Sequence, residues 1–295
     1  MHLTFVFGQS ETGLTAGDQS LRVQLRNQVL AGPGDETWDI GPVQHRGADA
    51  FGIHRFESEG FLCLAVVAPV TQPSIREISR TLYAALIQHL GVFHFHRIWN
   101  FIPEINRNHG VLDTYKLFCL GRAEALEALH NTPLPAASAV GTPGEHLVIV
   151  AIAGNAKAFP VENPLQVPAY RYPERYGPRS PSFARATRVN ASELYVSGTA
   201  SIRQSESVHT GDVAAQFALA MDNIDLVIRA AGLGDAGHVN HQKRRIYVRH
   251  PRDWQVLQSH PAADAQNLMT LNVIQAEICR PELLVEVETY LPAVA

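Results

Sequence analysis

The chain has 295 residues, 46% of them hydrophobic and 18% charged, and its formal net charge at neutral pH is −4. This composition is typical of a globular protein and excludes a disordered one, and the length allows two domains of ordinary size. A negative net charge gives no general attraction for nucleic acid or for an anionic membrane surface, so we expect neither as a partner.

Two further features concern the compartment. No apolar run is long enough to span a membrane, and the first residues lack the basic and apolar regions of a secretion signal. The three cysteines, Cys63, Cys119 and Cys279, are far apart and odd in number, which argues against a disulfide framework. We therefore expect a cytoplasmic protein with reduced thiols.

The first half of the chain is expected to contain a strand, a helix and a second strand. Residues 60–68 are almost all apolar, as in a buried strand. Apolar residues recur at helical spacing over 74–90, residues 92–101 favour a strand, and residues 113–129 mix extended and helical signals. Residues 136–145 are small and rich in proline and glycine, which is typical of a boundary between domains.

The second half has a clearer pattern of the same kind. Strands are expected over 193–200, 245–249 and 283–290. Apolar residues recur at helical spacing over 213–231, and a short helix is expected around 254–260. This order predicts an α/β (α+β) protein of two related halves, each a mixed β-sheet with helices packed on one face. The predicted domains are residues 1–140 and 146–295.

The segment 169–185 is too rich in proline for a helix or a central strand, yet it holds four arginines and three tyrosines. Forked guanidinium donors and aromatic faces suit a site for a small organic anion with more than one carboxylate. A solvated linker between two domains is the alternative that the local composition equally allows.

Two glutamates near the C-terminus are candidates for acid chemistry. Glu286 and Glu288 lie on one face of the expected last strand, because strand side chains alternate, and Val285 and Val287 then face the core. Such a pair usually marks the wet face of a sheet. If the face instead lines a cleft, a desolvated carboxyl acquires a raised pKa and can act as a general acid. Cys279, seven residues before Glu286, is either an inert core thiol or part of the same pocket.

Residues 97–106 form a second unusual string, which contains Trp99, Asn100 and Asn106. It is either a strand with a buried tryptophan, or a place where the two asparagines fix loop backbone at a cleft. The chain has no glycine-rich nucleotide motif, no nucleophile elbow and no complete metal-ligand spacing. We therefore expect no metal and no cofactor.

From residue 183 to residue 292 the order of elements resembles a Rid-type domain, the fold of enamine and imine deaminases. The likeness rests on Val196-Ser197-Gly198, Asp212-Val213-Ala214-Ala215-Gln216, Asp222-Asn223-Ile224, Ala230-Ala231-Gly232-Leu233, Tyr247-Val248 and Val285-Glu286-Val287-Glu288. Rid deaminases hold the substrate carboxylate with an arginine in the region where this chain reads Leu271-Asn272-Val273-Ile274. The resemblance therefore implies the fold but not the deaminase activity.

Three strings in the same order resemble the chorismatases, namely 97–106, 170–185 and 197–201. Chorismatases release pyruvate from chorismate with a Rid-like C-terminal half fused to a related N-terminal half. The resemblance implies this activity, chorismate as the small-molecule partner, no cofactor, and Glu286 as the acid that protonates the enolpyruvyl methylene. The predicted site consists of Glu286 and Cys279 as catalytic residues, with Arg179, Arg171, Arg185, Tyr170, Tyr176, Thr199, Ala200, Trp99 and Asn100 as substrate-binding residues.

Chorismatases differ in their ring product. The aromatising enzymes tend to carry cysteine at the position of Cys279, whereas Ala200 resembles the hydrolytic branch. The resemblance therefore implies 3-hydroxybenzoate, with 4-hydroxybenzoate as a further product, and hydrolysis to a dihydroxycyclohexadiene carboxylate as the alternative. A non-catalytic Rid-like binding protein for small molecules is the alternative of another class. Rid domains usually form trimers, but two fused halves can satisfy those contacts within one chain, so we expect a monomer.

Overall fold

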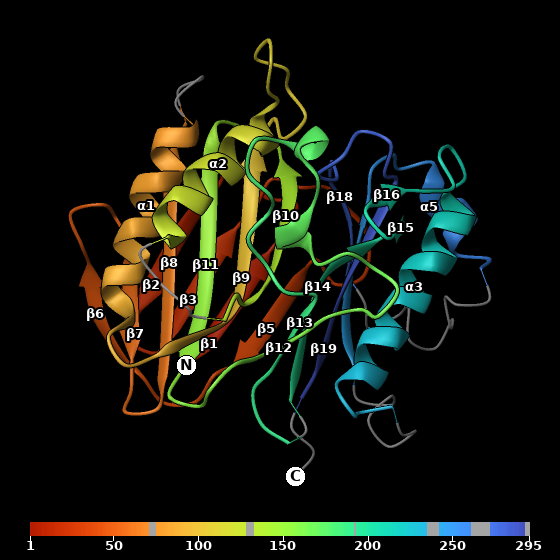
Figure 1. The fold of residues 1–295 in the computed structure, drawn as a ribbon. Coiled ribbons are helices and arrows are strands. Elements are labelled where there is room, and N and C mark those ends of the chain that lie inside the picture. The colour runs from red at the N-terminus through yellow and green to blue at the C-terminus, as the bar shows by residue number, and fades with distance from the viewer. Residues whose placement is uncertain (71–74, 128–132, 192, 235–241, 261–271, 293–295) are drawn as a thin grey trace.

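Two large mixed sheets lie beside each other, one built mainly from each half of the chain (Figure 1). The structure is a computed structural model, and it describes residues 1–70, 75–127, 133–191, 193–234, 242–260 and 272–292. The predicted fold class, α+β with two mixed sheets that each carry helices on one face, is confirmed.

The N-terminal half forms a six-stranded sheet in the order β10-β9-β11-β8-β7-β6. Its strands are β6 (Gln44–Ala48), β7 (His54–Glu57), β8 (Phe61–Pro69), β9 (His94–Pro103), β10 (Ala136–Thr142) and β11 (His146–Gly154). Helices α1 (Ile75–Leu90) and α2 (Thr114–Leu126) cover one face. The mixed signals of 113–129 resolve as α2, because the Asp113 side chain caps it by accepting from the Lys116 backbone N–H at 2.8 Å.

The C-terminal half forms a seven-stranded sheet in the order β12-β13-β14-β19-β17-β18-β4. Its strands are β4 (Val29–Ala31), β12 (Phe159–Val161), β13 (Ala186–Arg188), β14 (Leu194–Ala200), β17 (Lys243–Val248), β18 (Asn272–Gln275) and β19 (Val285–Leu291). Helices α3 (Val213–Ala230) and α5 (Asp253–Leu257) pack on one face, against residues that include Val285 and Val287. Glu286 and Glu288 therefore point to the opposite face, toward the N-terminal half.

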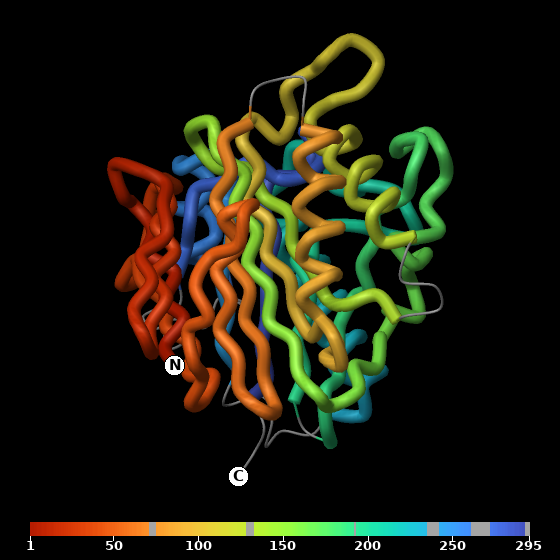
Figure 2. The backbone as a smooth tube through the Cα atoms, turned by 90° about the vertical axis from the view of Figure 1, so that its left-hand side faces the viewer, coloured from red at the N-terminus to blue at the C-terminus, as the bar shows by residue number. Residues whose placement is uncertain are grey.

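A small sheet near the N-terminus packs against both halves. Its order is β2-β3-β1-β5, from the strands β1 (His2–Val6), β2 (Gly13–Gly17), β3 (Ser20–Gln24) and β5 (Asp35–Asp39). It lies on the face of the six-stranded sheet that α1 and α2 leave open (Figure 2). Phe5 and Leu21 share one core with Trp99 of β9 and Tyr247 of β17. The first fifty residues thus hold the two large sheets together.

The boundary expected at 136–145 is wrong, because this segment forms β10 and the turn into β11. Both strands belong to the N-terminal sheet, so the domain ranges 1–140 and 146–295 do not coincide with the two large sheets. The small residues have a packing reason. A Cβ atom on Gly141 would stand 2.8 Å from Cβ of Glu277, and β10 runs beside β13 and β14. Small side chains in this segment allow β10 to lie close to the C-terminal half of the chain, and they do not mark a linker.

Helices α1 and α2 meet at a glycine. A Cβ atom on Gly121 would lie 2.0 Å from the carbonyl oxygen of Arg76, so another residue there would push the helices apart. This contact sets the position of the next residue, Arg122, which is buried.

Two short segments complete the description. The arginine-rich segment contains the 3₁₀ turns η1 (Ala169–Arg171) and η2 (Glu174–Tyr176), and β15 (Ile202–Arg203) pairs with β16 (Glu206–Ser207).

Candidate active site

Two adjacent chambers lie between the halves of the chain. The outer chamber has a volume of about 210 Å³ and the inner chamber about 40 Å³. Both are lined by Tyr115, Phe183, Gly198, Cys279 and Glu286. One side of the shared region therefore comes from α2, and another from β14, β19 and the loop before β19. An open groove of about 530 Å³ along α3 is larger, but none of the predicted site residues lines it.

Glu286 is buried where the two chambers meet, with 4% of its surface exposed. None of the residues that the structure describes donates a hydrogen bond to its carboxyl. Burial, followed by the charge of Glu288, raises the pKa of Glu286 to about 8, against the opposite effect of Arg97 and Arg185. At neutral pH the carboxyl therefore carries its proton, which is the form that a general acid needs.

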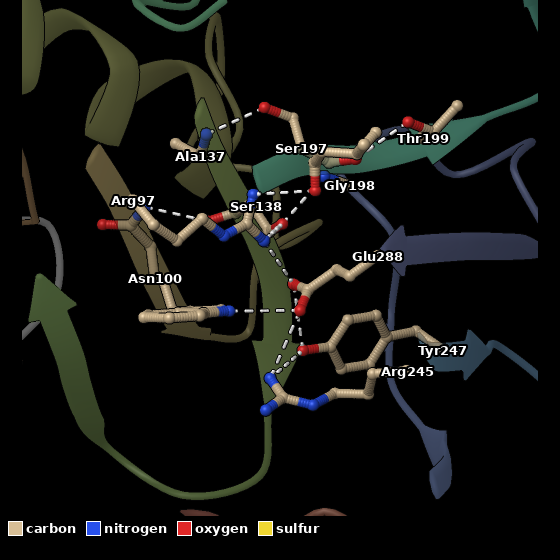
Figure 3. A network of polar contacts seen from close by, with 12 residues as sticks. Arg97, Asn100, Ala137, Ser138, Ser197, Gly198, Thr199, Arg245, Tyr247 and Glu288 are labelled. Atoms are coloured by element: carbon tan, nitrogen blue, oxygen red, sulfur yellow. Dashed lines mark hydrogen bonds and ion pairs between the residues drawn. The ribbon is translucent and has the colours of Figure 1, made fainter. Parts of the chain in front are cut away.

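A bulge in β14 makes room for this carboxyl. The pairing of β14 with β19 shifts register around Ser197 and Gly198, and the Gly198 N–H donates to Ser138 Oγ of β10 at 2.8 Å (Figure 3). The Ala137 N–H donates to Ser197 Oγ at 2.9 Å. A Cβ atom on Gly198 would stand 1.9 Å from Oε1 of Glu286. Glycine is thus required beside the acid.

Glu288, on the same face of β19, is in a different environment. Its carboxyl contacts Arg97 at 3.1 Å, Arg245 at 3.3 Å, the Trp99 indole N–H at 3.1 Å and the Tyr247 hydroxyl at 3.2 Å (Figure 3). These partners come from both halves, so Glu288 joins the two sheets. The glutamate pair is buried and does not form the wet face of a sheet.

The loop that carries Cys279 is fixed by two side chains from outside it. Asn106 Nδ2 donates to the Ile278 carbonyl at 3.1 Å, and Arg249 Nη2 donates to the carbonyls of Ile278 and Arg280 at 3.0 and 2.9 Å. Asn106 therefore fixes loop backbone at the cleft, as one of the two sequence interpretations predicted. Burial raises the pKa of Cys279 to about 12, so its thiol is neutral.

The outer chamber contains cations that lie against aromatic rings. Arg185 is buried, and its Nη2 donates to the Tyr172 hydroxyl at 2.5 Å. The guanidinium carbon of Arg280 lies 3.8 Å from the centre of the Tyr176 ring. Arg185, Tyr176 and Ala200, all named from the sequence, line this chamber together with Arg280.

Three other residues of the arginine-rich segment lie elsewhere. Arg179 is exposed and forms an ion pair with Glu127, just after α2. Arg171 and Tyr170 are also exposed, with the guanidinium carbon 5.8 Å from the centre of the ring. None of the three lines either chamber, whereas Tyr172, Tyr176 and Arg185 of the same segment line the outer one.

Trp99, Asn100 and Thr199 are buried behind the chambers and line neither of them. Trp99 binds Glu288, as described above. Asn100 Nδ2 donates to the Ser138 carbonyl at 2.8 Å, and Thr199 Oγ1 donates to the Ser197 carbonyl at 2.8 Å. They hold strands in place and do not reach the cavity.

Most residues that line the chambers were not predicted, among them Tyr115, Arg122, Tyr172 and Arg280. The sequence offered a reason to include Arg280 and Tyr172 in the site, since Arg280 follows Cys279 directly and Tyr172 lies in the arginine-rich segment. No sequence pattern pointed to Tyr115 or Arg122 as site residues, because their segment mixed helical and extended patterns.

Groups of three or more metal-ligating side chains are absent among the described residues. Within the same ranges, no helix combines the length and the apolar character needed to cross a membrane.

Comparison with known proteins gives one consistent result. Residues 36–153 match the family described as "Chorismatase FkbO/Hyg5-like, N-terminal". A 3-hydroxybenzoate synthase of Streptomyces hygroscopicus is 34% identical over an alignment of 284 positions, which covers 88% of this chain and 81% of that protein. A chorismatase of Streptomyces rapamycinicus is 40% identical over an alignment of 220 positions, which covers 69% of this chain and 65% of that protein.

A solved structure agrees with these relatives. The crystal structure of a chorismatase superposes with a TM-score of 0.86 at 27% identity, covering 98% of this chain and 92% of that one. The fold and the site place the chain among α+β proteins with a buried acid between two sheets. The chain belongs to the chorismatase family. The family resemblance predicted from the sequence is thereby confirmed.

Proposed function

We propose that this protein converts chorismate into 3-hydroxybenzoate and pyruvate. The names of its relatives and the chorismatase structure support this class of reaction. The observation that carries the proposal is Glu286, a protonated carboxyl that borders both chambers and receives no hydrogen bond from any residue that the structure describes. Chorismate has an enol ether, and an enol ether is cleaved when an acid protonates its terminal carbon.

The reaction balances with one acid and one water. Glu286 transfers its proton to the enolpyruvyl methylene, which becomes the methyl group of pyruvate, and a cation forms at the carbon next to the ether oxygen. Water adds to that carbon and returns one proton to Glu286, which leaves a hydroxyl on the carbon. This hydroxyl gives its proton to the ether oxygen as the bond between that carbon and the ether oxygen breaks, so pyruvate leaves as a ketone and the ring keeps a hydroxyl. Loss of the neighbouring ring hydroxyl with a ring proton releases one water and gives the aromatic ring. General acid catalysis contributes about 100- to 10,000-fold in rate.

The substrate is a dianion, and the chambers supply cations for it. Arg185 and Arg280 line the outer chamber, with the Tyr176 ring beside Arg280. Guanidinium groups hold carboxylates through paired hydrogen bonds. The proposed chemistry uses no metal and no organic cofactor, because the acid and the attacking water perform every step.

The ring product depends on what surrounds Glu286. Cys279 borders both chambers as a neutral thiol, and its presence supports the aromatic product, with 4-hydroxybenzoate as a minor one. Ala200 lines the outer chamber and pairs in register with Glu286. This small residue favours the second candidate, hydrolysis to a dihydroxycyclohexadiene carboxylate and pyruvate.

The proposed enzyme is a monomer, because residues from both halves of one chain line the same chambers. Light scattering of the purified protein measures this directly, and a trimer mass contradicts it.

Purified protein incubated with chorismate tests the function. We expect pyruvate, detected with lactate dehydrogenase, and 3-hydroxybenzoate, detected by chromatography. Glu286→Gln should lower the rate at least about 100-fold while chorismate still binds. Glu77→Gln, on the exposed face of α1, is the matched control and should have no effect. Binding of chorismate without any pyruvate would instead support a non-catalytic binding protein.

A further inference from the structure

Ser138 of β10 lies in the wall of the inner chamber, which Glu286 also borders. The serine is buried, and its Oγ atom accepts two hydrogen bonds, one from the Gly198 N–H at 2.8 Å and one from Nη2 of Arg97 (Figure 3). A serine hydroxyl has two lone pairs and a single proton. Both lone pairs are engaged by N–H donors, so the Ser138 hydroxyl can only donate.

The proton of this hydroxyl has no acceptor within the described ranges. The position where a Cβ atom on Gly198 would stand is 3.0 Å from Oγ of Ser138 and 1.9 Å from Oε1 of Glu286, so both oxygens border the same small space. A buried polar group without a partner is costly. Across this space the serine offers a free donor, and the carboxyl of Glu286 offers acceptor oxygens.

A hydroxyl that can only donate has a specific effect on a neighbouring acid. Ser138 cannot accept the proton of Glu286, so that proton stays available for the substrate. The hydrogen bond becomes strong after the proton has left, because a carboxylate is a better acceptor than a neutral carboxyl group. A donor in this place therefore stabilises the state in which the substrate is protonated and Glu286 is charged. Such selective stabilisation is what lowers a reaction barrier.

We propose that the Ser138 hydroxyl is a further catalytic group, which donates a hydrogen bond to the Glu286 carboxylate while the proton of that residue is on the substrate. This inference rests on the proposed function. Ser138 keeps its own proton, so the proton that reaches the methylene still leaves Glu286 and is replaced from the attacking water. Arg97 is a positioning residue, because its contacts with Glu288 at 3.1 Å and the Val196 carbonyl at 3.2 Å fix the guanidinium that fills one lone pair of Ser138.

Other titratable groups also face Glu286, and their charges are the same whichever neutral residue stands at position 138. They are Glu288 of β19, Arg97 of β9, Arg185 before β13, Tyr115, Cys119 and Arg122 of α2, and Cys279 of the loop before β19. Loss of a donor to the carboxylate raises the pKa of Glu286. Movement of Arg97 into the space left by the serine would instead lower that pKa. The direction of the change therefore separates the two causes.

Steady-state kinetics of Ser138→Ala test the catalytic role. We expect kcat for pyruvate release at neutral pH to fall about 10- to 100-fold, the effect of one hydrogen bond to a charged group. The alkaline decline of kcat/KM should move upward by about one pH unit, because the Glu286 carboxylate has lost a donor. Ser138→Cys keeps a weak S–H donor and should recover part of both effects.

Ser197→Ala is the matched control for the fold. The Ser197 hydroxyl also joins neighbouring strands, since it accepts from the Ala137 N–H at 2.9 Å and donates to the Ala184 carbonyl at 2.6 Å. Its proton is thus already used, and it lines neither chamber. Both variants should lower Tm by similar amounts, because each leaves a buried backbone N–H without its acceptor. Only Ser138→Ala should move the alkaline decline of kcat/KM. An unchanged kcat in Ser138→Ala, or a lower kcat with the decline unmoved, would refute the proposal.

Infrared difference spectra follow the titration of Glu286 without turnover. Spectra of the ligand-free protein minus those of Glu286→Gln isolate this carboxyl, and the same pair is recorded with Ser138→Ala in both members. We expect the carboxyl to titrate at higher pH when Ser138 is replaced. An unchanged or lower pKa would overturn the hydrogen bond, whatever the rates. If the protein releases no pyruvate from chorismate, the proposed function fails, while the infrared titration still decides whether Ser138 donates to Glu286.

Discussion

Gly198 and Glu286 lie on neighbouring strands with no room for a side chain between them. A Cβ atom on Gly198 would stand 1.9 Å from Oε1 of Glu286 and 3.0 Å from Oγ of Ser138. Both neighbours are buried, and Ser138 is held by the Gly198 N–H and by Arg97. The carboxyl is thus the group that must move if the glycine is replaced.

Gly198→Ala should therefore disable the acid without removing it. The added methyl group displaces the Glu286 carboxyl, and we expect kcat for pyruvate release to fall at least about 100-fold, the lower range for general acid catalysis. Gly60→Ala is the matched control, because nothing lies within 4 Å of its Cβ position. Near-normal turnover by Gly198→Ala would show that Glu286 does not have to occupy this position.

The pH dependence follows from the raised pKa of Glu286. The acid works only while protonated, so kcat/KM should be level below about pH 8 and fall as the pH rises through the pKa of about 8. The substrate's carboxylates stay ionised in this range and do not contribute. In the complex they raise the pKa of Glu286 further, so kcat should decline at a higher pH than kcat/KM. Rates of pyruvate release from pH 6 to 10 measure both pH profiles. A kcat/KM that rises with pH would contradict the assignment of Glu286 as the general acid.

The sequence predicted the position of Glu286 but not its environment. Strand alternation places Glu286 and Glu288 on one face in any β-strand, and this part of the prediction is confirmed. Glu288 contacts Arg97 and Arg245, whereas Glu286 receives no hydrogen bond within the described part of the chain, and this difference depends on how β9 and β17 lie relative to β19. Contacts between residues so distant in sequence are not encoded in local periodicity.

The arginines also show which site residues the sequence alone cannot predict. Composition singled out the segment that carries four arginines, but only Arg175 and Arg185 line a chamber. Of these two only Arg185 is buried, because Arg175 is exposed and forms an ion pair with Glu206. Arg122 was overlooked because it lies in a helix whose residues show no clear period, and because its lack of a partner among the described residues is not visible in the sequence. A buried cation without a counter-charge can be recognised only from three-dimensional contacts.

Cys279→Ala should change the product more than the rate. The thiol is neutral, because its pKa is raised to about 12, so it acts through its volume and low polarity beside Glu286. Alanine leaves space for a water at that position, and we expect the ring product to shift from 3-hydroxybenzoate toward the dihydroxy acid while pyruvate release continues. Chromatography of the ring products measures the ratio. Cys63→Ala, in β8 and outside both chambers, should leave it unchanged. The same product ratio in both variants would remove Cys279 from product control.

Asn106→Ala should reproduce this product shift from a distance. Asn106 donates to the carbonyls of Ile278 and Cys279 and accepts from Arg249, so its loss frees the loop and leaves buried groups unpaired. We expect the free energy of unfolding to fall by about 1–3 kcal/mol. The share of 3-hydroxybenzoate should fall as well, because the thiol is no longer held beside Glu286. Asn108→Ala, an exposed residue that caps the next turn, is the matched control for both measurements. A loss of stability with an unchanged product ratio would mean that Asn106 supports the fold alone, and that Cys279 keeps its place without it.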